Sequence, residues 1–486
     1  MKRFIIFLFL SLFVLSLALS ACGSGLRKPD PRDESSREEG PRNIVSTDTG
    51  SSNMPNVTPD ERNDPVAAKA PDKKIITVWS WDRDLPIILE KFKELHPDFG
   101  YEIKVRDFSN HETGFQVLLD QGLAAGGPDA PDIYDVESSY VVKYTQGDAC
   151  HYASAYSDLG IDVDNLLNEA SIANYIVELG TNPEGKVVAL GYQSTAGVFI
   201  YRRSIAKAVW GTDDPAVIKN AAGPGWDKFL KAAADLKAKG YRICSSVDDV
   251  WQAMEQNADK GWIVDGKLYI DPKREEFMDF AKILRQKGYL NNSRSWTDAW
   301  YSDMKDGGGK KVFGFLGPSW LLNYILLPGS GGNAPGEGTY GDWALCEPPA
   351  GFDWGGTWVL ANKDTRVKEG VAEILRWITL DTSEAGLQYL WANDKLGFHV
   401  RDAVASAAVM KKSDGKHDFL GGQNPFGVYI SAGDMTNGKN RALQNEAIRY
   451  KWLEQVHEYI DGKKTREQAS ADFKKQVANE LDITVE

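Results

Sequence analysis

The amino-acid sequence predicts an α/β fold divided into two lobes. Two observations lead to this prediction. From residue 75 onward, segments of strand type alternate with segments of helix type. The part after residue 73 is also longer than one hydrophobic core normally supports, which favours two lobes. The residues before it differ in composition and stand outside the predicted fold.

The first lobe begins with a strand–helix–strand pattern. The β-type run 75–81 is followed by apolar residues at helical spacing over 85–95. A strand is expected at 101–105, a helix at 111–125 and a third strand at 133–136. Strands separated by helices are joined by crossovers, so we expect a mostly parallel sheet covered by helices.

The middle of the chain is more helical. Apolar residues at helical spacing predict helices at 226–239, 248–257 and 273–287, with a short strand at 241–244. A strand is expected at 312–316. Further elements are a helix at 320–325, a strand at 358–361, a helix at 367–380 and two C-terminal helices, the second starting with a capping box between Thr465 and Gln468.

The N-terminus has the pattern of a secretory signal. Lys2 and Arg3 precede an apolar run over 4–19, and the small residues Ser20 and Ala21 lead to Cys22. The order Leu-Ser-Ala-Cys resembles the bacterial lipobox, which implies cleavage of a signal peptide, residues 1–22, and lipidation of Cys22. The alternatives are an ordinary cleaved signal with an incidental cysteine and an uncleaved anchor, for which the run is short.

A polar stretch, residues 23–73, follows the signal. It contains no aromatic residue and few aliphatic ones, and it is rich in Ser, Pro, Asn, Asp, Glu and Arg. Such a composition cannot bury enough apolar surface to offset its chain entropy. We therefore expect a disordered tether between a membrane anchor and the folded part.

Charge and cysteine content exclude some classes of protein. A formal net charge of −13 argues against binding to nucleic acid and against electrostatic docking on anionic lipid. The body holds Cys150, Cys244 and Cys346 in no CxxC pair, which leaves one disulfide or three buried thiols. The six histidines are isolated, so no zinc-type metal site and no cofactor is expected.

Several short motifs resemble the family 1 extracellular solute-binding proteins, the carbohydrate receptors of ABC importers. Their order and spacing carry the resemblance, and they lie at 76–81 (ITVWSW), 131–136 (PDIYDV), 185–190 (GKVVAL), 198–202 (VFIYR), 225–229 (GWDKF), 317–320 (GPSW) and 355–359 (GGTWV). The resemblance implies the type II periplasmic-binding-protein fold, whose two lobes are joined by several hinge crossings with the ligand cleft between them. It also implies a carbohydrate ligand, permease subunits as partners, an extracytoplasmic location, a monomer and no enzymatic activity.

The same resemblance implies where the lobes begin and end. Crossings are expected near 191–197, 354–357 and 380–383. The predicted regions are the signal peptide 1–22, the tether 23–73, lobe one at 74–193 plus 355–382, and lobe two at 194–354 plus 383–486.

Residues able to recognise a sugar should gather at the cleft. Sugars offer flat C–H faces for aromatic rings and many hydroxyls for polar side chains. Open α/β sheets bind ligands at the carboxyl ends of their strands. The candidates at these strand ends are Trp81, Asp82 and Arg83 after the first strand, and Glu137, Ser138 and Tyr140 after the third. Asp82 and Arg83 could instead form a solvated ion pair.

The remaining candidates lie at the crossings or at motifs of the family. They are Gln193 and Ser194, Trp251 on a helix that the family uses at the cleft floor, Trp320 in the GPSW turn, and Trp354, Gly355 and Gly356 at the second crossing. Because aromatic residues more often belong to a core than to a site, each of these tryptophans has a core alternative.

The sequence leaves some functions other than a sugar receptor open. No GxSxG, HExxH, Walker or Rossmann motif is present, although the 69 acidic residues leave a secreted glycoside hydrolase open, since that chemistry needs only two opposed carboxylates. A non-sugar solute or a peptide could bind to the same fold. A surface adhesin would be expected to carry repeats, and the sequence has none.

Overall fold

The computed structural model describes residues 74–109, 114–439, 441–481 and 483–485, which belong to one compact unit, Lys73–Glu486. The predicted signal peptide, the tether and the lipidation of Cys22 lie outside the described residues. None of the helices in the described ranges is long and apolar enough to cross a membrane.

The first lobe is built on a five-stranded sheet with the order β2-β1-β3-β10-β4. Its strands are β1 Lys74–Ser80, β2 Tyr101–Asp107, β3 Ile133–Glu137, β4 Ala189–Gly191 and β10 Thr357–Ala361. β1 is parallel to β2 over Lys74↔Tyr101 to Ser80↔Asp107, and it is parallel to β3. β10 is antiparallel to β3 and to β4. The expected parallel arrangement therefore holds for the first three strands only.

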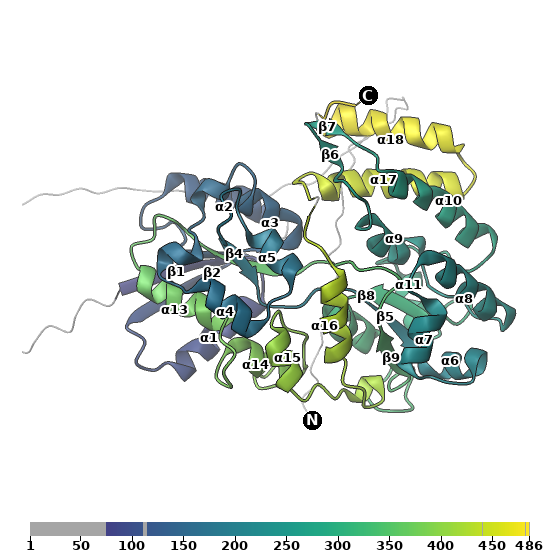
Figure 1. Cartoon of the computed structure of the whole chain (residues 1–486), viewed down its shortest axis with the longest axis horizontal. Helices are drawn as coiled ribbons and strands as arrows, with labels where there is room; N and C mark the ends of the chain where they lie inside the picture. Colours follow the sequence, from purple (N-terminus) through teal and green to yellow (C-terminus); the bar gives the residue numbers. More distant parts are fainter. Residues whose placement is uncertain (1–73, 110–113, 440, 482, 486) are drawn as a thin grey trace, which may run out of the picture. The chain divides into compact units, whose positions relative to one another are not determined.

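In the part of the chain that the structure describes, eight helices pack with the first lobe, and Figure 1 shows them around its sheet. They are α1 Asp84–Leu95, α2 Phe115–Ala125, α3 Ser138–Thr145, α4 Val163–Ala170, α5 Asn174–Gly180, α13 Lys368–Thr379, α14 Leu387–Ala392 and α15 Ala407–Lys412. Helix α1 shows why they pack there: Leu85, Ile88, Leu89 and Phe92 form one apolar face, and all four are buried. Two short 3-10 turns, Cys150–Tyr152 and Tyr156–Leu159, follow α3.

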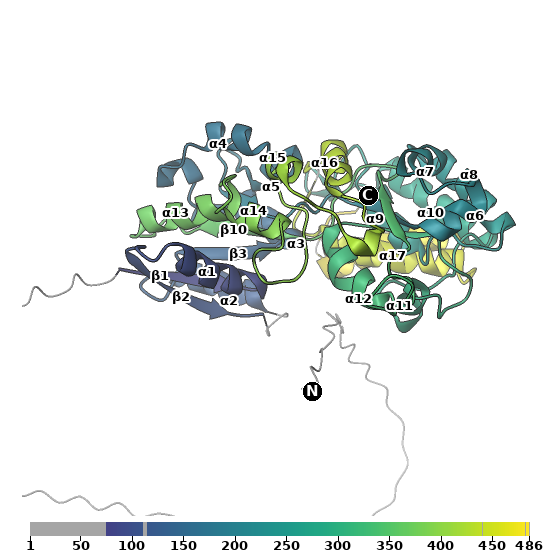
Figure 2. The same ribbon diagram turned by 90° about the horizontal axis from the view of Figure 1, so that it is seen from below.

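The second lobe contains an antiparallel three-stranded sheet with the order β8-β5-β9. Its strands are β5 Val198–Arg202, β8 Gly314–Gly317 and β9 Trp343–Cys346, with a separate hairpin of β6 Ile263–Val264 and β7 Lys267–Leu268. A second hydrophobic core lies here and includes Phe199, Trp251, Phe277 and Trp452. Figure 2 shows the two groups of elements from below.

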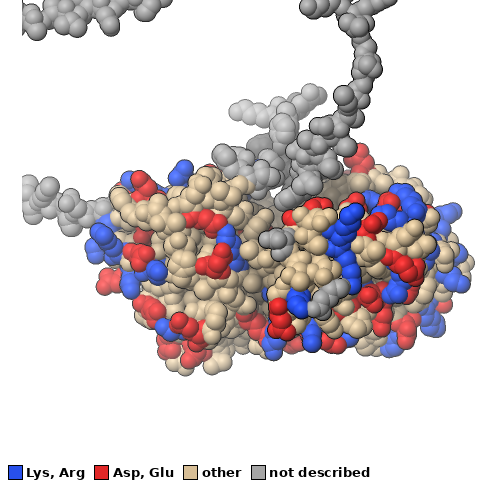
Figure 3. Space-filling model, turned by 90° about the horizontal axis from the view of Figure 1, so that it is seen from above, with Lys and Arg blue, Asp and Glu red and all other residues tan. Residues whose placement is uncertain are grey.

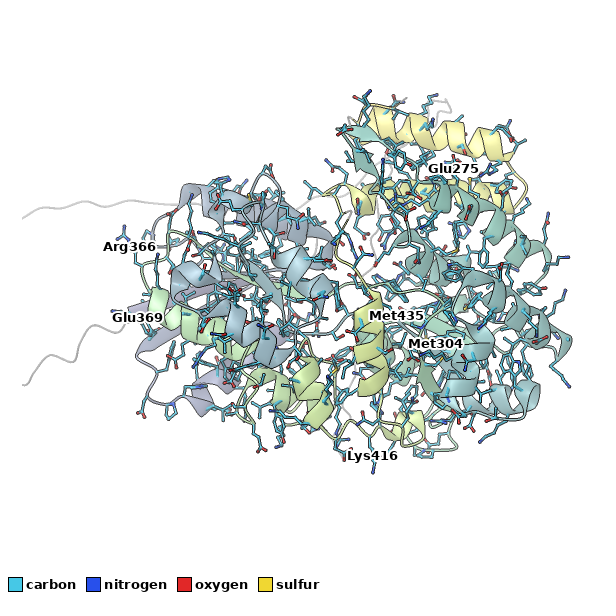
Figure 4. The ribbon with its side chains drawn as sticks, in the orientation of Figure 1. Glu275, Met304, Arg366, Glu369, Lys416 and Met435 are labelled. Atoms are coloured by element: carbon cyan, nitrogen blue, oxygen red, sulfur yellow. The ribbon has the colours of Figure 1, made fainter. Side chains whose placement is uncertain are left out.

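The second lobe is mostly helical, as the sequence predicts. Its helices are α6 Arg203–Trp210, α7 Pro215–Ala222, α8 Trp226–Ala238, α9 Val247–Glu255, α10 Pro272–Gln286, α11 Asp298–Met304, α12 Leu327–Gly329, α16 Phe426–Met435, α17 Asn445–Ile460 and α18 Arg466–Leu481, with a 3-10 turn at Asp418–Leu420. Helix α16, whose last residue Met435 is labelled in Figure 4, contacts strand β5 of the second lobe and helix α5 of the first lobe.

Three predicted details can be compared with the structure. The capping box is confirmed, because the Thr465 N–H donates to Gln468 and the Gln468 N–H donates back to the Thr465 hydroxyl. The predicted strand 241–244 is not a full strand in the structure; it makes only the isolated parallel bridges Arg242 to Val312 and Cys244 to Leu290. The predicted helix 320–325 is a π-helix, Leu321–Leu326, which ends where Pro328 begins to restrict the backbone.

Two segments that connect the sheets lie side by side. Residues 192–197 run from β4 to β5, and residues 347–356 run from β9 to β10. The Gly197 N–H donates to the Phe352 carbonyl oxygen (2.7 Å), and the Trp354 N–H donates to the Thr195 carbonyl oxygen (3.1 Å). On its other side, the first segment pairs with residues 403–405. The lobes are therefore joined by a band of hydrogen-bonded extended chain.

The first lobe was predicted to end at residue 382. Helix α14 contacts α13, and α15 contacts α4, so both pack with first-lobe helices. The chain next contacts the second sheet at the 3-10 turn Asp418–Leu420, which packs on β9. These contacts favour a first lobe that extends beyond residue 382, while the predicted boundaries as a whole stay a prediction.

The three cysteines of the body are unpaired in the structure. Cys244 and Cys346 are buried, whereas Cys150 is partly exposed. Burial raises the pKa of both the Cys244 and the Cys346 thiol, which keeps them protonated and unreactive. The expectation of three buried thiols is thus wrong for Cys150, because it lies in a 3-10 turn at the lobe surface.

Candidate functional site

Three tryptophan rings meet where the second crossing segment passes the second lobe. The ring centroids of Trp320 and Trp354 are 4.9 Å apart, edge to face. Trp296 lies parallel to Trp320, with centroids 6.2 Å apart, and edge-on to Trp354 at 5.8 Å. All three rings are only partly buried. We call Trp296, Trp320 and Trp354 the tryptophan cluster.

Local backbone features position the cluster. Trp320 directly precedes the π-helix, and its indole N–H donates to the Trp354 carbonyl oxygen (2.7 Å). A Cβ added to Gly355 would lie 3.2 Å from the Trp320 indole nitrogen, so a glycine lets the crossing segment approach the ring. Trp296 has a positive φ of 69°, which is unusual for a large side chain. Its loop holds the ring against the other two.

The sequence predicts Trp320 and Trp354 as site residues but does not predict Trp296. The available signal was an isolated tryptophan within the polar stretch 291–298, which precedes α11. An aromatic residue in a polar loop has no apolar periodicity to assign it to a core. Nothing in the sequence, however, indicates that this loop folds back onto residue 320.

The candidates at the end of β1 lie at the lobe junction. Trp81 and Asp82 are partly exposed, and one Asp82 carboxylate oxygen accepts hydrogen bonds from Tyr192 (2.7 Å) and Thr357 (3.0 Å). Tyr192 lies on the first crossing segment and Thr357 begins β10. Asp82 therefore ties the end of the first strand to the first crossing segment and to the start of β10. Arg83, also partly exposed, precedes α1.

Two further carboxyl groups, which the sequence does not predict, act on this part of the junction. Asp84 begins α1, and Asp402 lies fully buried beside residues 403–405. Burial raises the pKa of Asp84 to about 8, with further contributions from the negative charges of Asp82 and Asp402. Burial likewise raises the pKa of Asp402 to about 6, although Ser319, the Ala403 N–H and Asn323 oppose the shift. Several acidic groups therefore share this part of the junction.

The candidates after β3 face helix α17 of the second lobe. Glu137 caps α3 by accepting a hydrogen bond from the Ser139 N–H (2.7 Å). Burial raises its pKa to about 7; the Glu446 carboxylate adds to this rise, while the Arg449 guanidinium opposes it. Tyr140 is partly exposed nearby, whereas Ser138 is buried and donates its N–H to the Gly356 carbonyl oxygen (3.0 Å).

The candidates on the crossing segments act mainly through their backbone conformation and backbone hydrogen bonds. Gln193 is partly exposed, and Ser194 is buried, with its N–H bonded to the Ala403 carbonyl oxygen (2.9 Å). Gly355 and Gly356 have φ values of 68° and 108°, a region that favours glycine. The structure thus brings Gln193, Ser194 and these glycines to the lobe junction as backbone elements.

Trp251 does not reach the junction surface. It is fully buried in the second core, where its ring lies 4.6 Å from Phe277 and 6.2 Å from Trp452. Eight of the nine residues of α9 are buried, so the helix has no open face. The expectation that this ring contacts a ligand is therefore not supported, because the second core encloses it.

Two cavities stand out in the described residues. One, of about 750 Å³, lies on the first lobe between Gly160–Glu169 and α13. The other, of about 210 Å³, is lined by Ser194, Ala405, Tyr429 and neighbouring residues of α15 and α16. Neither is lined by the tryptophan cluster. Within the described ranges, no group of three or more His, Cys, Asp or Glu side chains is arranged to hold a metal ion.

The surface does not suggest binding to nucleic acid. Lys and Arg side chains are interspersed with Asp and Glu over the face shown in Figure 3, in keeping with the acidic net charge of the chain. A nucleic-acid site would instead gather basic residues on one face.

Comparison with known proteins identifies relatives of the fold. A family described as "Bacterial extracellular solute-binding protein" matches residues 88–414. No curated protein matches the chain. Among solved structures, a family 1 extracellular solute-binding protein is 16% identical with a TM-score of 0.67, covering 82% of this chain and 98% of that one.

Two further structures are similar at low identity. The galacto-N-biose/lacto-N-biose I-binding protein of an ABC transporter from Bifidobacterium longum, in complex with lacto-N-biose, is 17% identical with a TM-score of 0.61, covering 85% and 98% of the two chains. The sugar-binding protein MalE from Xanthomonas citri is 12% identical with a TM-score of 0.64, covering 83% and 96%. The two-lobed periplasmic-binding-protein fold predicted from the sequence is confirmed.

Proposed function

Because the chain belongs to the bacterial extracellular solute-binding protein family, we propose that it is the substrate-binding component of an ABC importer and captures a carbohydrate between its lobes. The tryptophan cluster is the observation that carries this proposal. Three partly exposed rings at the lobe junction offer flat apolar faces to the C–H faces of pyranose rings. No catalytic step is assigned to the site.

Polar groups of the lobe junction would bind hydroxyls. Trp81, Asp82 and Arg83 of the first lobe are partly exposed at the end of β1. Tyr140 on α3 and Gln193 on the first crossing segment are also partly exposed. The similarity to proteins described as binding lacto-N-biose and other sugars supports an oligosaccharide as the ligand. An oligosaccharide could place one ring on the cluster and its neighbours along this polar edge.

Ligand binding is proposed to close the lobes. The pairing of residues 192–197 with 347–356 lets both segments bend together, and Gly355 and Gly356 can absorb a rotation at little cost. A sugar that contacts both lobes does so fully only in a closed state, so it must favour that state. A permease could then distinguish the loaded receptor from the empty one.

A panel of mono- and oligosaccharides tests the proposed function. A cognate sugar at 100 times its dissociation constant should stabilise the protein by roughly 2.7 kcal/mol, measured as a rise in the melting temperature. Small-angle scattering on residues 74–486, which contain both hydrophobic cores, should then show a smaller radius of gyration. A panel of diverse sugars that leaves the melting temperature unchanged would argue for another solute.

The proposed receptor acts as a monomer held at the outer face of the cell membrane by lipid on Cys22. The motive is the Leu-Ser-Ala-Cys order followed by the polar stretch 23–73. Replacing Cys22 by alanine should release the protein from membranes into the medium, because a single anchor would be lost. Fractionation followed by immunoblotting measures this, with Cys150→Ala as the matched cysteine control. Retention of the Cys22→Ala protein on membranes would contradict the anchor.

A further inference from the structure

The Trp296 ring is carried by a loop with a strained backbone. Residues 291–296 lie between α10 and α11, and Trp296 itself has a φ of 69°. A positive φ is rare for a large side chain, and it persists only where the surrounding structure imposes it. We call residues 291–296 the Trp296 loop. The contacts of this loop therefore decide whether Trp296 lies against Trp320 and Trp354.

Ser295, the residue before Trp296, is bound through both its backbone and its side chain. The Ser295 N–H donates to the Asp248 carboxylate (3.2 Å), and the Ser295 hydroxyl donates to the Asp249 carboxylate (3.2 Å). Asp248 and Asp249 are adjacent residues in the first turn of α9. One turn of another helix therefore fixes the Trp296 loop immediately before the aromatic ring.

Asp249 also fixes the chain after Trp296. The Asp249 oxygen that accepts from Ser295 accepts a second hydrogen bond from the Trp300 indole N–H (2.9 Å). Trp300 is fully buried on α11, and its ring centroid lies 5.3 Å from that of Trp296. A single carboxylate oxygen thus holds residues on both sides of Trp296, which restricts the path of the chain between them.

The two carboxylates are themselves held in place by other contacts. Asp249 is 2% exposed, and its other oxygen accepts from the Ser246 N–H (3.0 Å) in the capping box of α9. One Asp248 oxygen lies 2.7 Å from the His457 Nε2 atom of α17, while the other accepts from Ser295. A side chain locked by packing and hydrogen bonds can hold its neighbour in one geometry.

We propose that Asp248, Asp249 and Ser295 are positioning residues, which hold Trp296 parallel to Trp320 and so set the affinity of the tryptophan cluster for its ligand. This inference rests on the proposed function and deepens it. A loop that adopted other conformations would present Trp296 only part of the time, and the apparent dissociation constant rises as the competent population falls. Helix α9 then serves the site through the polar side chains of its first turn, not through a ring.

The test uses Ser295→Ala and Ser295→Thr in the full-length chain in mild detergent. The alanine variant loses the hydroxyl that donates to Asp249, whereas the threonine variant keeps a hydroxyl. Calorimetry with the best sugar of the panel should show binding about 2- to 10-fold weaker for Ser295→Ala, and close to the parent for Ser295→Thr. Parent affinity in Ser295→Ala would overturn the assignment. Equal weakening in both variants would overturn it too, because the hydroxyl would not be the cause.

A double-mutant cycle separates positioning from a general structural role. In the Trp296→Ala background, Ser295→Ala and Asp248→Ala should change the dissociation constant no further, because the ring that they position is gone. An additive loss in that background would show that they act elsewhere and would overturn the inference. Ser204→Ala is the matched control, since the Ser204 hydroxyl on α6 also donates to a carboxylate, that of Asp342. It should bind the sugar like the parent.

A measurement without ligand keeps this inference apart from the proposed function. In the chain labelled with 5-fluorotryptophan, the fluorine resonance of Trp296 is the one that Trp296→Phe removes. It should shift or broaden in Ser295→Ala and stay in place in Ser204→Ala, because only the first variant frees the Trp296 loop. An unmoved resonance in Ser295→Ala overturns the inference, whether or not a sugar binds. A parent protein that binds no sugar of the panel overturns the proposed function, while the resonance still decides whether these residues position the ring.

Discussion

Replacing Trp320 by alanine should weaken sugar binding by about 1–3 kcal/mol, which corresponds to roughly 5- to 150-fold in the dissociation constant. The magnitude follows from aromatic stacking of flat ligands on exposed rings. Each ring of the tryptophan cluster contacts the other two, and Trp320 also donates its indole N–H to the Trp354 carbonyl oxygen. The loss of Trp320 would remove one stacking face and the hydrogen bond to the Trp354 carbonyl oxygen.

Calorimetry with the best sugar of the panel measures the effect, and a matched variant controls for it. Trp226 is also a partly buried tryptophan of the second lobe, but its ring packs on Phe229 and Phe280 and contacts none of the three rings of the tryptophan cluster in the described ring pairs. Trp226→Ala should therefore leave the dissociation constant unchanged. Trp296→Ala should act in the same direction as Trp320→Ala. Equal affinity of the Trp320 and Trp296 variants and the parent would show that the cluster is not the binding surface.

Local patterns in the sequence were sufficient for most elements of the fold. The helix α1 and the strands β1, β2 and β3 lie where apolar periodicity placed them. Periodicity does not report strand direction, however. β10 is antiparallel to its neighbours because the chain enters the first sheet from β9 of the other lobe. That direction depends on the connection and not on the residues of the strand.

The site was harder to predict because its residues come from distant segments. Trp320 and Trp354 were found through their motifs, whereas Trp296 is placed by a loop whose path no local pattern reveals. Asp402 was not predicted for the same reason. Its sequence neighbours are unremarkable, and its importance comes from its position beside Asn323 and Asp84. Contacts of this kind depend on tertiary structure.

Trp251 was assigned to the cleft by analogy with the family, although its surroundings in the structure are those of a core residue. Helix α9 carries Val250, Ala253 and Met254 around the ring, and all are buried. A helix enclosed on nearly every side belongs to a core. The analogy assigned this helix to the cleft, but α10 and α17 both pack in the same region, since Phe277 and Trp452 contact the ring.

Replacing Trp251 by alanine should therefore destabilise the protein without a specific loss of ligand affinity. Removing a fully buried tryptophan costs about 3–5 kcal/mol, because the cavity that remains adds to the lost burial. Unfolding by urea, followed by fluorescence, should show a lower midpoint. Trp251→Phe retains an aromatic ring against Phe277 and should lose less stability, which keeps the comparison informative if the alanine variant does not fold.

The binding measurement decides between a core role and a site role for this ring. Below the unfolding transition, Trp251→Phe should bind the sugar with the parent dissociation constant, because the ring is fully buried in the second core and contacts Trp262 and Trp452. A weaker dissociation constant with an unchanged urea midpoint would contradict this structural role. It would place Trp251 in the cleft after all, and the second core would then have to open when the ligand binds.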